Sequence, residues 1–533
     1  ALIASGARFL PTWDNRVNAE NPPLLKALCA LPTLLPGFHP KPPPEDTFCS
    51  YDMHQGIAYG NDVLYSQPNP RRILFLCRMG SLVLAAAGAA LLYGVASRIW
   101  TPGVGLAVAG AFAVSPNVLA HARLVTPDLG CTVMMFAAAA AAYPLFFRRR
   151  LHWARVMLAG ALTGLALLTK YTAVLLAPAT GLAVLAVCCT GQERAVPIRR
   201  LLGRLGCAWI AALLVVQIGY GFRDGVVVLN REEYRSPLVK TLQRVPVLSD
   251  CPLPVPGLYV RGFDIAAYNN RPGYPAIFLG DVYPKGGRWW YYYGVAVFLK
   301  TPVALLLLWA CGALALLRGE AGVSRTGARV AAVLPALLLL NFSVVAYRQL
   351  GLRYVLPVWP FLMLLAGGAV QAVARTGDRH VKMAAAAVAG LYVATALLAF
   401  PHYLAYFNTF AGGHEHGWRY LASANCDWGQ DLPALAQWQK KHGYPPMWLA
   451  YYGTAPPKAY DVQAEPWGHG RIPDWVAVSV TNYYLWYRDP LIAVLRDRFE
   501  PEARLGGSIH IYRTDTEFLE AVARQALEEA TTP

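Results

Sequence analysis

Charged side chains stand beside apolar runs at several places in this 533-residue chain, and their types limit the chemistry they could perform. The first such segment reads TWDNRVNAENPPLLKALCALP (12–32) and carries the acids Asp14 and Glu20 and the cation Lys26. A carboxylate can act as a general base or a metal ligand, and an ammonium group can bind phosphate. Two simpler interpretations stay open. Asp14 also suits a turn, and an acid before two prolines also suits the start of a helix.

Two later segments repeat this combination of charge and apolar sequence. PNVLAHARLVTPD (116–128) carries Arg123 and Asp128, and GLALLTKYTAVLL (164–176) places Lys170 between two apolar stretches. Charges at the edge of a bilayer are costly unless they are paired, so such residues are candidates for a functional site. Asp128 could instead complement the dipole at a helix start, and Lys170 could extend its ammonium group to the membrane surface.

Two arginines, Arg348 and Arg353, flank the sequence QLGL just before another apolar run. Several cations on one face of a membrane suit an anionic group at the interface, such as a lipid phosphate, which arginine binds through two parallel hydrogen bonds. Both arginines could also be simple membrane anchors. Together with the acids, they predict an interfacial site at which a phosphate is bound and a proton is removed.

The composition indicates what must position these residues. The chain is 56% hydrophobic and only 15% charged, with a mean hydropathy of +0.34, as expected for a polytopic membrane protein. The net charge of +16 comes from arginine clusters between apolar runs, a pattern of membrane topology rather than of nucleic-acid binding. Ten cysteines without a CxxC pair indicate neither a zinc module nor a disulfide framework.

The apolar runs predict ten membrane-spanning helices. They cover Arg72–Arg98, Pro102–Val114, Leu129–Phe147, Ala154–Thr169, Thr172–Cys189, Leu205–Tyr220, Tyr293–Leu317, Ala328–Ala346, Tyr354–Ala374 and Ala384–Phe400. Arginine clusters fill four alternate loops, which the positive-inside rule places in the cytoplasm. All the large loops, and all the candidate residues, then lie on the opposite face. Such asymmetry favours an enzyme working at that face over a channel.

The predicted domains follow this order: a first outer loop with interfacial helices (1–71), transmembrane helices (72–221), a long outer loop (222–292), further transmembrane helices (293–401) and an extracytoplasmic domain (402–533). In the last domain, helix-like stretches alternate with the strand-like MWLAYYG, WVAVSV and IHIYR, which predicts a soluble α/β fold. The fold class is therefore an all-α polytopic membrane domain with a C-terminal α/β domain.

The order of the motifs resembles a known family. The three segments above are followed by GLRYVLPVWPFL (351–362), YFNTFAGG (406–413) and SANCDWGQDLPAL (423–435). This set resembles the membrane glycosyltransferases of the GT-C fold, and especially the bacterial protein O-mannosyltransferase-like and aminoarabinose-transferase-like proteins. The resemblance covers nearly the whole chain and rests on the order of the motifs together.

The resemblance implies an enzyme that passes a sugar from a polyprenyl-phosphate carrier to a protein or lipid acceptor at the outer face of the membrane. Glu20 matches the acid before the first-loop prolines, although Asn21 stands where one branch of the family has a lysine. Asp128, Lys170 and Arg353 match the second-loop acid, the lysine of the LTK turn and the arginine before the LP-x-x-P helix. The family's leading Asp-Glu pair is absent, so we expect the main general base, and a first transmembrane helix, upstream of Ala1. NAENPPLLKALCALP is then an interfacial helix that presents Glu20 to the site.

The resemblance also sets the expected partners. These are a polyprenyl-phosphate-linked sugar, the acceptor and membrane lipid, in the bacterial plasma membrane with the site facing outward and without nucleic acid. No cofactor is required, and a divalent metal ion stays an open option. Two other functions remain: a transporter or flippase of the lipid-linked sugar, and an inactive membrane scaffold with an outer binding domain. The sequence identifies neither the sugar nor the acceptor.

Overall fold

A computed structural model describes residues 1–189, 196–271, 275–283, 287, 289–320, 349–486 and 488–515 of the chain. The chain divides into two compact units. The first comprises Ala1–Arg271, Leu307–Val345 and Tyr354–Val388, and the second comprises Pro272–Leu306, Ala346–Arg353 and Ala389–Pro533. In the described residues the first unit is helical, and the second combines helices with two β-sheets.

Five helices of the described part are long and apolar enough to cross a membrane. They are α4 (Pro70–Ile99), α7 (Pro127–Phe147), α10 (Ile198–Gly219), the stretch Leu356–Arg375 that contains α17 (Trp359–Arg375), and α18 (Arg379–Leu398). Two bent pairs raise the number to seven if each is one span: α5 (Pro102–Ala113) with α6 (Pro116–Ala122), and α14 (Tyr292–Lys300) with α15 (Val303–Arg318). The prediction of an integral membrane protein with a helical membrane domain is confirmed.

Most of the ten predicted spans have a helical counterpart, but some differ in detail. The predicted span from Ala154 is the shorter α8 (Trp153–Leu167), and the next begins with a 3-10 turn (Tyr171–Leu175) before α9 (Leu176–Cys189). The predicted span Ala328–Ala346 lies outside the described residues. The number ten therefore stays a prediction.

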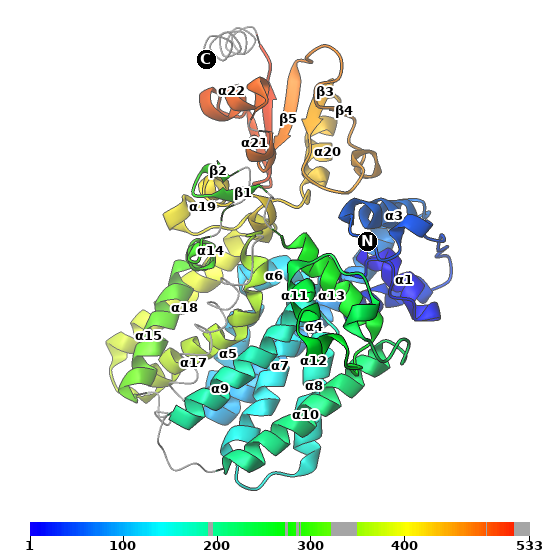
Figure 1. Ribbon diagram of the computed structural model, residues 1–533. Helices are drawn as coiled ribbons and strands as arrows, with labels where there is room; N and C mark the ends of the chain where they lie inside the picture. Colours follow the sequence, from blue (N-terminus) through cyan, green and yellow to red (C-terminus); the bar gives the residue numbers. More distant parts are fainter. Residues whose placement is uncertain are drawn as a thin grey trace, which may run out of the picture. The chain divides into compact units, whose positions relative to one another are not determined.

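Small residues let the membrane helices approach closely. α8 packs against both α7 and α10, and Figure 1 shows these helices side by side. A Cβ added at Gly160 would lie 2.3 Å from the carbonyl oxygen of Ala208, and one at Gly164 would lie 2.6 Å from that of Ala212. Gly160 and Gly164, four residues apart on α8, thus form a glycine seam with α10. Small residues at helix contacts are typical of membrane proteins, in which the hydrophobic effect does not drive the helices together.

The first loop folds onto itself before the chain enters the membrane. It contains α1 (Leu2–Thr12), α2 (Pro23–Ala30), a 3-10 turn (Leu31–Leu34) and α3 (Met53–Tyr65). Leu31, Leu34 and Leu35 are about half exposed, at 48%, 61% and 56%. Exposed leucines at the end of α2 agree with the predicted interfacial position, where lipid would cover them.

The long loop after α10 adds three more helices to the first unit. These are α11 (Pro237–Gln243), α12 (Pro246–Ser249) and α13 (Gly257–Asn269). Asp264 of α13 accepts backbone hydrogen bonds from Arg235 and Ser236, at 2.9 Å each, and one from the hydroxyl of Tyr51, at 2.5 Å. These bonds join the long loop to the first loop.

The second unit contains a five-stranded sheet in the order β4-β3-β5-β7-β6. The strands are β3 (Met447–Ala450), β4 (Glu465–Pro466), β5 (Trp475–Ser479), β6 (Ala503–Leu505) and β7 (Ile509–Arg513). β3 runs parallel to β4 and β5, whereas β7 is antiparallel to β5 and β6. The second unit also contains α19 (Gly413–His416), α20 (Leu432–Lys441), α21 (Asn482–Leu485), α22 (Pro490–Arg498) and the hairpin of β1 (Ala276–Phe278) and β2 (Asp281–Tyr283).

The predicted α/β character of the C-terminal region is confirmed. The three predicted strands correspond to β3, β5 and β7, and DLPALAQWQKKHG corresponds to α20. Leu432 and Leu435 of α20 pack in one core with Leu449, Ala477 and Ile511 of these strands. The last predicted helix, TEFLEAVARQALEEA, lies outside the described residues.

Candidate active site

An ion pair joins the two charged residues that the sequence placed at neighbouring helix ends. Asp128 lies in the first turn of α7, directly after Pro127, and Lys170 follows α8. The Nζ atom of Lys170 donates to Oδ1 of Asp128 at 2.6 Å, and it lies 4.6 Å from the centre of the Tyr354 ring. The side chain of Asp128 has no exposed surface, and that of Lys170 is 14% exposed. Such burial is tolerated because the two charges neutralise each other.

The first loop is held against this ion pair. The backbone amide of Leu24 donates to the carbonyl of Leu168 at 3.0 Å, two residues before Lys170. The hydroxyl of Tyr171 donates to the carbonyl of Ala19 at 3.0 Å. Leu25 packs against α7 at Gly130, where an added Cβ would lie 2.6 Å from a methyl carbon of the leucine. Glu20 is therefore fixed close to the turn that carries Lys170.

Glu20 itself is held by amide groups. Its carboxylate accepts hydrogen bonds from the side chain of Asn18 at 3.1 Å and from that of Asn269, at the end of α13, at 3.2 Å. The residue is half-buried and stands just before α2, not in its first turn. Glu20 thus connects the first loop with the long loop beside the Lys170 turn.

Lys26 is fully buried and supports the loop from inside. Its Nζ atom donates to the carbonyls of Val17 and Asn18 at 3.1 and 2.9 Å. Asn18 has a positive φ of 53°, so its carbonyl reaches the lysine from a left-handed turn. Burial lowers the pKa of Lys26 to about 7, although attraction to Glu20 opposes the shift. These contacts favour a structural role, and the predicted contact of Lys26 with a phosphate stays a prediction.

Asp14 is enclosed by two arginines. Arg8 and Arg16 each donate to its carboxylate, at 2.8 and 2.9 Å. Burial alone raises the pKa of Asp14, but the hydrogen bonds from Arg16 and Arg8 outweigh it and hold the pKa well below its usual range. A carboxylate with so low a pKa is a weak base. Its contacts therefore favour a structural role over the predicted catalytic one, which stays untested.

The other predicted cations are in different surroundings. Arg123 is exposed at the end of α6, and Arg348 lies outside the described residues. Arg353 belongs to the second unit, where its guanidinium group lies 4.7 Å from the centre of the Trp428 ring. Its predicted convergence with Asp128 and Lys170 stays a prediction. No group of three or more His, Cys, Asp or Glu side chains within the described ranges could hold a metal ion.

Sequence reasoning missed how the turn that carries Arg353 is fixed. Oδ1 of Asn425 accepts the backbone amide of Leu352 at 3.1 Å, while Nδ2 donates to the hydroxyl of Tyr292 at 3.2 Å. The buried Lys300 donates to the backbone carbonyl of Asn425 at 2.5 Å and to that of Leu404 at 2.8 Å. The motif SANCDWGQD therefore has a structural role. Its Asn425 holds the turn that carries Arg353, and its Trp428 supplies the indole ring against which the guanidinium group lies.

Asp427 of the same motif is a second residue that sequence reasoning did not select. It is completely buried, and its Oδ1 atom accepts the backbone amide of Gly429 at 3.0 Å. Burial raises the pKa of Asp427 to about 7, although hydrogen bonds from Gly429 and Thr481 oppose the shift. The carboxyl group beside Trp428 consequently gains or loses a proton near neutral pH.

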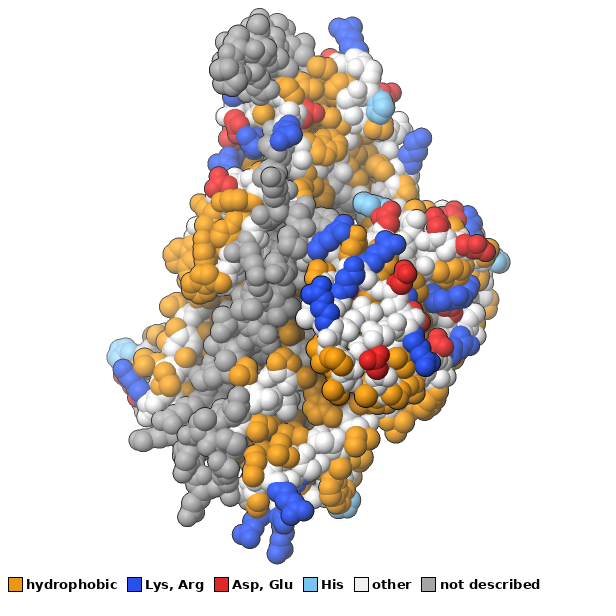
Figure 2. Space-filling model, viewed as in Figure 1, with side chains coloured by type: hydrophobic (Ala, Val, Ile, Leu, Met, Phe, Trp, Pro, Cys, Tyr) orange, Lys and Arg blue, Asp and Glu red, His pale blue; other side chains and the backbone are white. Residues whose placement is uncertain are grey.

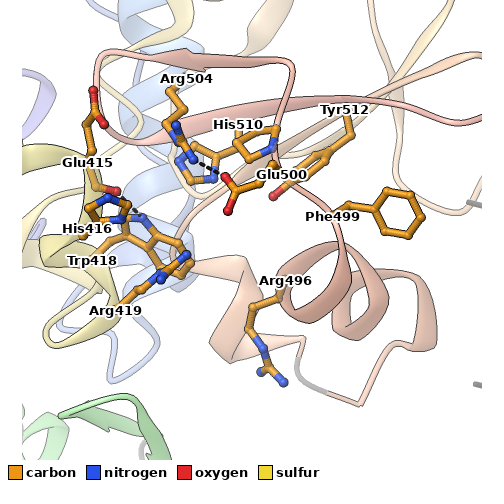
Figure 3. Close-up of a pocket in the computed structure, with 11 residues that line it drawn as sticks. Glu415, His416, Trp418, Arg419, Arg496, Phe499, Glu500, Arg504, His510 and Tyr512 are labelled. Atoms are coloured by element: carbon orange, nitrogen blue, oxygen red, sulfur yellow. Dashed lines mark hydrogen bonds and ion pairs between the residues drawn. The ribbon is translucent and has the colours of Figure 1, made fainter.

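A small pocket of the second unit was not predicted from the sequence either (Figure 3). Arg419 and Arg504 line it together with Trp418, and Arg504 is paired with Glu500. His510 is buried beside them, and burial lowers its pKa to about 3, so the ring is neutral and the positive charge comes from the arginines. These residues come from separate segments, and no spacing in the sequence brings them together.

Comparison with known proteins gives one family and several solved structures. Residues 74–218 match the family model described as dolichyl-phosphate-mannose-protein mannosyltransferase. No curated protein matches the chain. The matched segment includes Arg123, Asp128 and Lys170, but not the first loop or Arg353.

Two crystal structures of ArnT from Cupriavidus metallidurans are similar over 97% of this chain and 93% of theirs. The apo form has 13% identity and a TM-score of 0.47, and the form bound to undecaprenyl phosphate has 14% identity and a TM-score of 0.45. The apo oligosaccharyltransferase of Archaeoglobus fulgidus is similar over 92% of this chain and 66% of its own, with 14% identity and a TM-score of 0.42. The family match confirms the predicted resemblance to membrane mannosyltransferases over residues 74–218, the segment that holds the Asp128–Lys170 pair.

Proposed function

We propose that this protein transfers a sugar from a polyprenyl-phosphate carrier to a protein or lipid acceptor at the outer face of the membrane. The observation that carries the proposal is the buried ion pair of Asp128 and Lys170, because it lies inside the segment that matches the mannosyltransferase family. The family's description names dolichyl-phosphate mannose, a mannose on a polyprenyl-type phosphate, together with a protein acceptor. We extend the donor class, but not a particular sugar, to this chain.

Lys170 stabilises the leaving group in this proposal. An ammonium group has three N–H donors, and one of them is directed at Asp128. The carboxylate fixes the position of the ammonium group, and another N–H then meets the phosphate oxygen on which negative charge develops as the sugar departs. Arg123, in the same unit, supplies further positive charge to the phosphate.

Glu20 is the acid of this chain best suited to remove the acceptor proton. Hydrogen bonds from Arg16 and Arg8 hold the pKa of Asp14 well below its usual range, and Asp128 positions Lys170. Glu20 lies beside the Lys170 turn, where the amides of Asn18 and Asn269 orient its carboxylate. The acceptor oxygen or nitrogen loses its proton to the base and attacks the anomeric carbon while the bond to the carrier phosphate breaks. A single displacement of this kind inverts the anomeric centre.

The test uses the purified full chain in lipid with a polyprenyl-phosphate sugar extracted from membranes of the source cells. Mass spectrometry follows the release of free polyprenyl phosphate and the appearance of glycosylated acceptor. We expect Glu20→Gln to lower the rate at least about 100-fold, the usual contribution of a positioned base. Lys170→Met should also lose activity.

Lys41→Met is the matched control, because Lys41 forms an ion pair with Asp62 at the same 2.6 Å on the exposed surface. It should retain full activity. Transport of the intact lipid-linked sugar without release of the carrier would refute the proposal, as would full activity of Glu20→Gln together with Lys170→Met.

A further inference from the structure

A hollow lined by arginines lies at the opposite ends of the membrane helices from Asp128. It has a volume of about 440 Å³ and is lined by Arg149, Arg150, Leu151, Trp153, Val156, Arg200, Gly203 and Arg204. These residues come from the loop between α7 and α8, the first turn of α8 and the first two turns of α10. Figure 2 shows Lys and Arg side chains gathered at the lower end of the view, where Figure 1 places this loop and the start of α10.

One of the lining arginines is built into the protein. Arg204 is only 6% exposed and donates to the carbonyls of Leu145, Arg148 and Arg149 at 3.1, 2.9 and 3.0 Å. These carbonyls belong to the end of α7 and the residues after it, where the helix dipole is negative. Arg204 thereby holds the end of α7 against α10 at the base of the hollow. The negative end of the α7 dipole partly balances its charge.

The positive charges of the other three lining arginines are not balanced in this way. Among the described residues, Arg149, Arg150 and Arg200 form no ion pair, and no carboxylate lines the hollow. Cations held close together repel one another, so an anion between them is favourable. Guanidinium groups suit phosphate in particular, because their N–H donors match its oxygens in pairs.

The remaining wall of the hollow is apolar. Trp153 is 60% exposed and Leu158, on the same helix, is 53% exposed. Both lie at the end of a membrane domain, where a tryptophan typically sits at the level of the lipid head groups. An occupant therefore needs a phosphate next to a hydrocarbon chain, and a basic hollow between helices at the membrane surface has that character.

We infer that this hollow binds the phosphate head group of an anionic phospholipid from the leaflet on the arginine-rich side, which the positive-inside rule makes cytoplasmic. Arg149, Arg150 and Arg200 surround the phosphate, and Trp153 lies against the glycerol and the start of the acyl chains. The site is separate from the proposed glycosyl-transfer site, and its occupancy does not depend on that function. It anchors the ends of α7, α8 and α10 to one lipid.

The experiment places the purified full chain in phosphatidylcholine nanodiscs that contain increasing fractions of phosphatidylglycerol with brominated acyl chains. Bromine quenches tryptophan fluorescence at short range. The chain has 15 tryptophans, so the signal of the site is the part of the quenching that Trp153→Phe removes. We expect this part to saturate at a low fraction of phosphatidylglycerol and to be absent with brominated phosphatidylcholine alone.

Two double variants test the role of the arginines. Arg149→Gln with Arg200→Gln should weaken the saturable quenching roughly 30-fold, as expected for two cations near a charged membrane surface. Arg375→Gln with Arg379→Gln removes two arginines of another loop on the same predicted side and should leave it unchanged. Equal loss in both pairs would mean a general surface charge and would overturn the proposal.

Two other outcomes would also overturn it. Equal quenching by brominated phosphatidylcholine and phosphatidylglycerol would mean that the arginines do not distinguish an anionic head group from a zwitterionic one. Displacement by inorganic phosphate at low millimolar concentration would mean that the hollow takes a free anion and not a lipid. The circular dichroism spectrum of each variant confirms that its helices are intact, and Trp153→Phe provides the reference in every case.

Discussion

Replacing Lys170 with methionine tests whether Asp128 depends on its partner. Methionine keeps an unbranched apolar side chain up to the ε position and removes the ammonium group. At 2.6 Å and an effective dielectric constant of 20, the attraction between the two charges is about 6 kcal/mol. Desolvation offsets much of it, but Asp128 would be left as an unpaired charge with no exposed surface, and loss of one partner of a buried pair costs about 3–5 kcal/mol.

A double-mutant cycle separates this ion pair from other effects of the substitution. The free energy of unfolding is measured in mixed micelles by titration with a denaturing detergent, for Lys170→Met, Asp128→Asn and both together. We expect the double variant to recover at least about 2 kcal/mol relative to the sum of the single variants. The same cycle on Lys41 and Asp62, whose side chains are 43% and 58% exposed, should give about 0–1 kcal/mol. Equal coupling in the two cycles would refute the claim that burial makes the Lys170 pair important.

Three further predictions concern other parts of the molecule. Gly160→Leu should separate α8 from α10, because its Cβ would lie 2.3 Å from the Ala208 carbonyl oxygen, and should lower the free energy of unfolding by roughly 1–3 kcal/mol. Unchanged detergent unfolding would contradict the glycine seam. Burial raises the pKa of Asp427 to about 7, above its value of about 3.9 in the unfolded chain. Its stabilising contribution is therefore present below pH 4 and is lost as the pH rises to 7. Asp427→Asn should remove this part of the pH dependence of the melting temperature, and parallel profiles of the two proteins would refute it. A cysteine at position 150 should react with an impermeant reagent only after the cells are opened, since the loop is predicted to be cytoplasmic. Rapid labelling of intact cells would overturn the topology.

The sequence predicted the helices and the main strands because their signals are local. Apolar runs marked α4, α7 and α17, and β-branched and aromatic residues marked β5 and β7. β4 and β6 were not predicted, since they have two and three residues and are strands only through pairing with β3 and β7. The start of α10 was placed too late, at Leu205, because the arginines of its first turns interrupt the apolar pattern.

The candidate site was predictable only in part. The cost of charge at a membrane edge selected Asp128 and Lys170, and the structure joins them directly. The same reasoning selected Asp14 and Lys26, whose partners are supplied by the local fold. Arg8 lies six residues before Asp14, and the carbonyls that Lys26 binds depend on the left-handed turn at Asn18. Side-chain charge can be read from a sequence, but the direction of a backbone carbonyl cannot.

The contacts of the first loop have a consequence for how substrates come and go. Leu24 and Ala19 are tied to the LTK turn through Leu168 and Tyr171, and Asn15 donates to the hydroxyl of Tyr220 at 3.3 Å. To swing outward, the segment would have to break these hydrogen bonds and the one that Asn269 donates to Glu20, and it would expose the buried Tyr171 and Tyr220. It therefore behaves as a fixed wall and not as a lid. In the proposed reaction, the carrier and the acceptor come and go past other parts of the protein, while the carboxylate of Glu20 keeps its place from one turnover to the next.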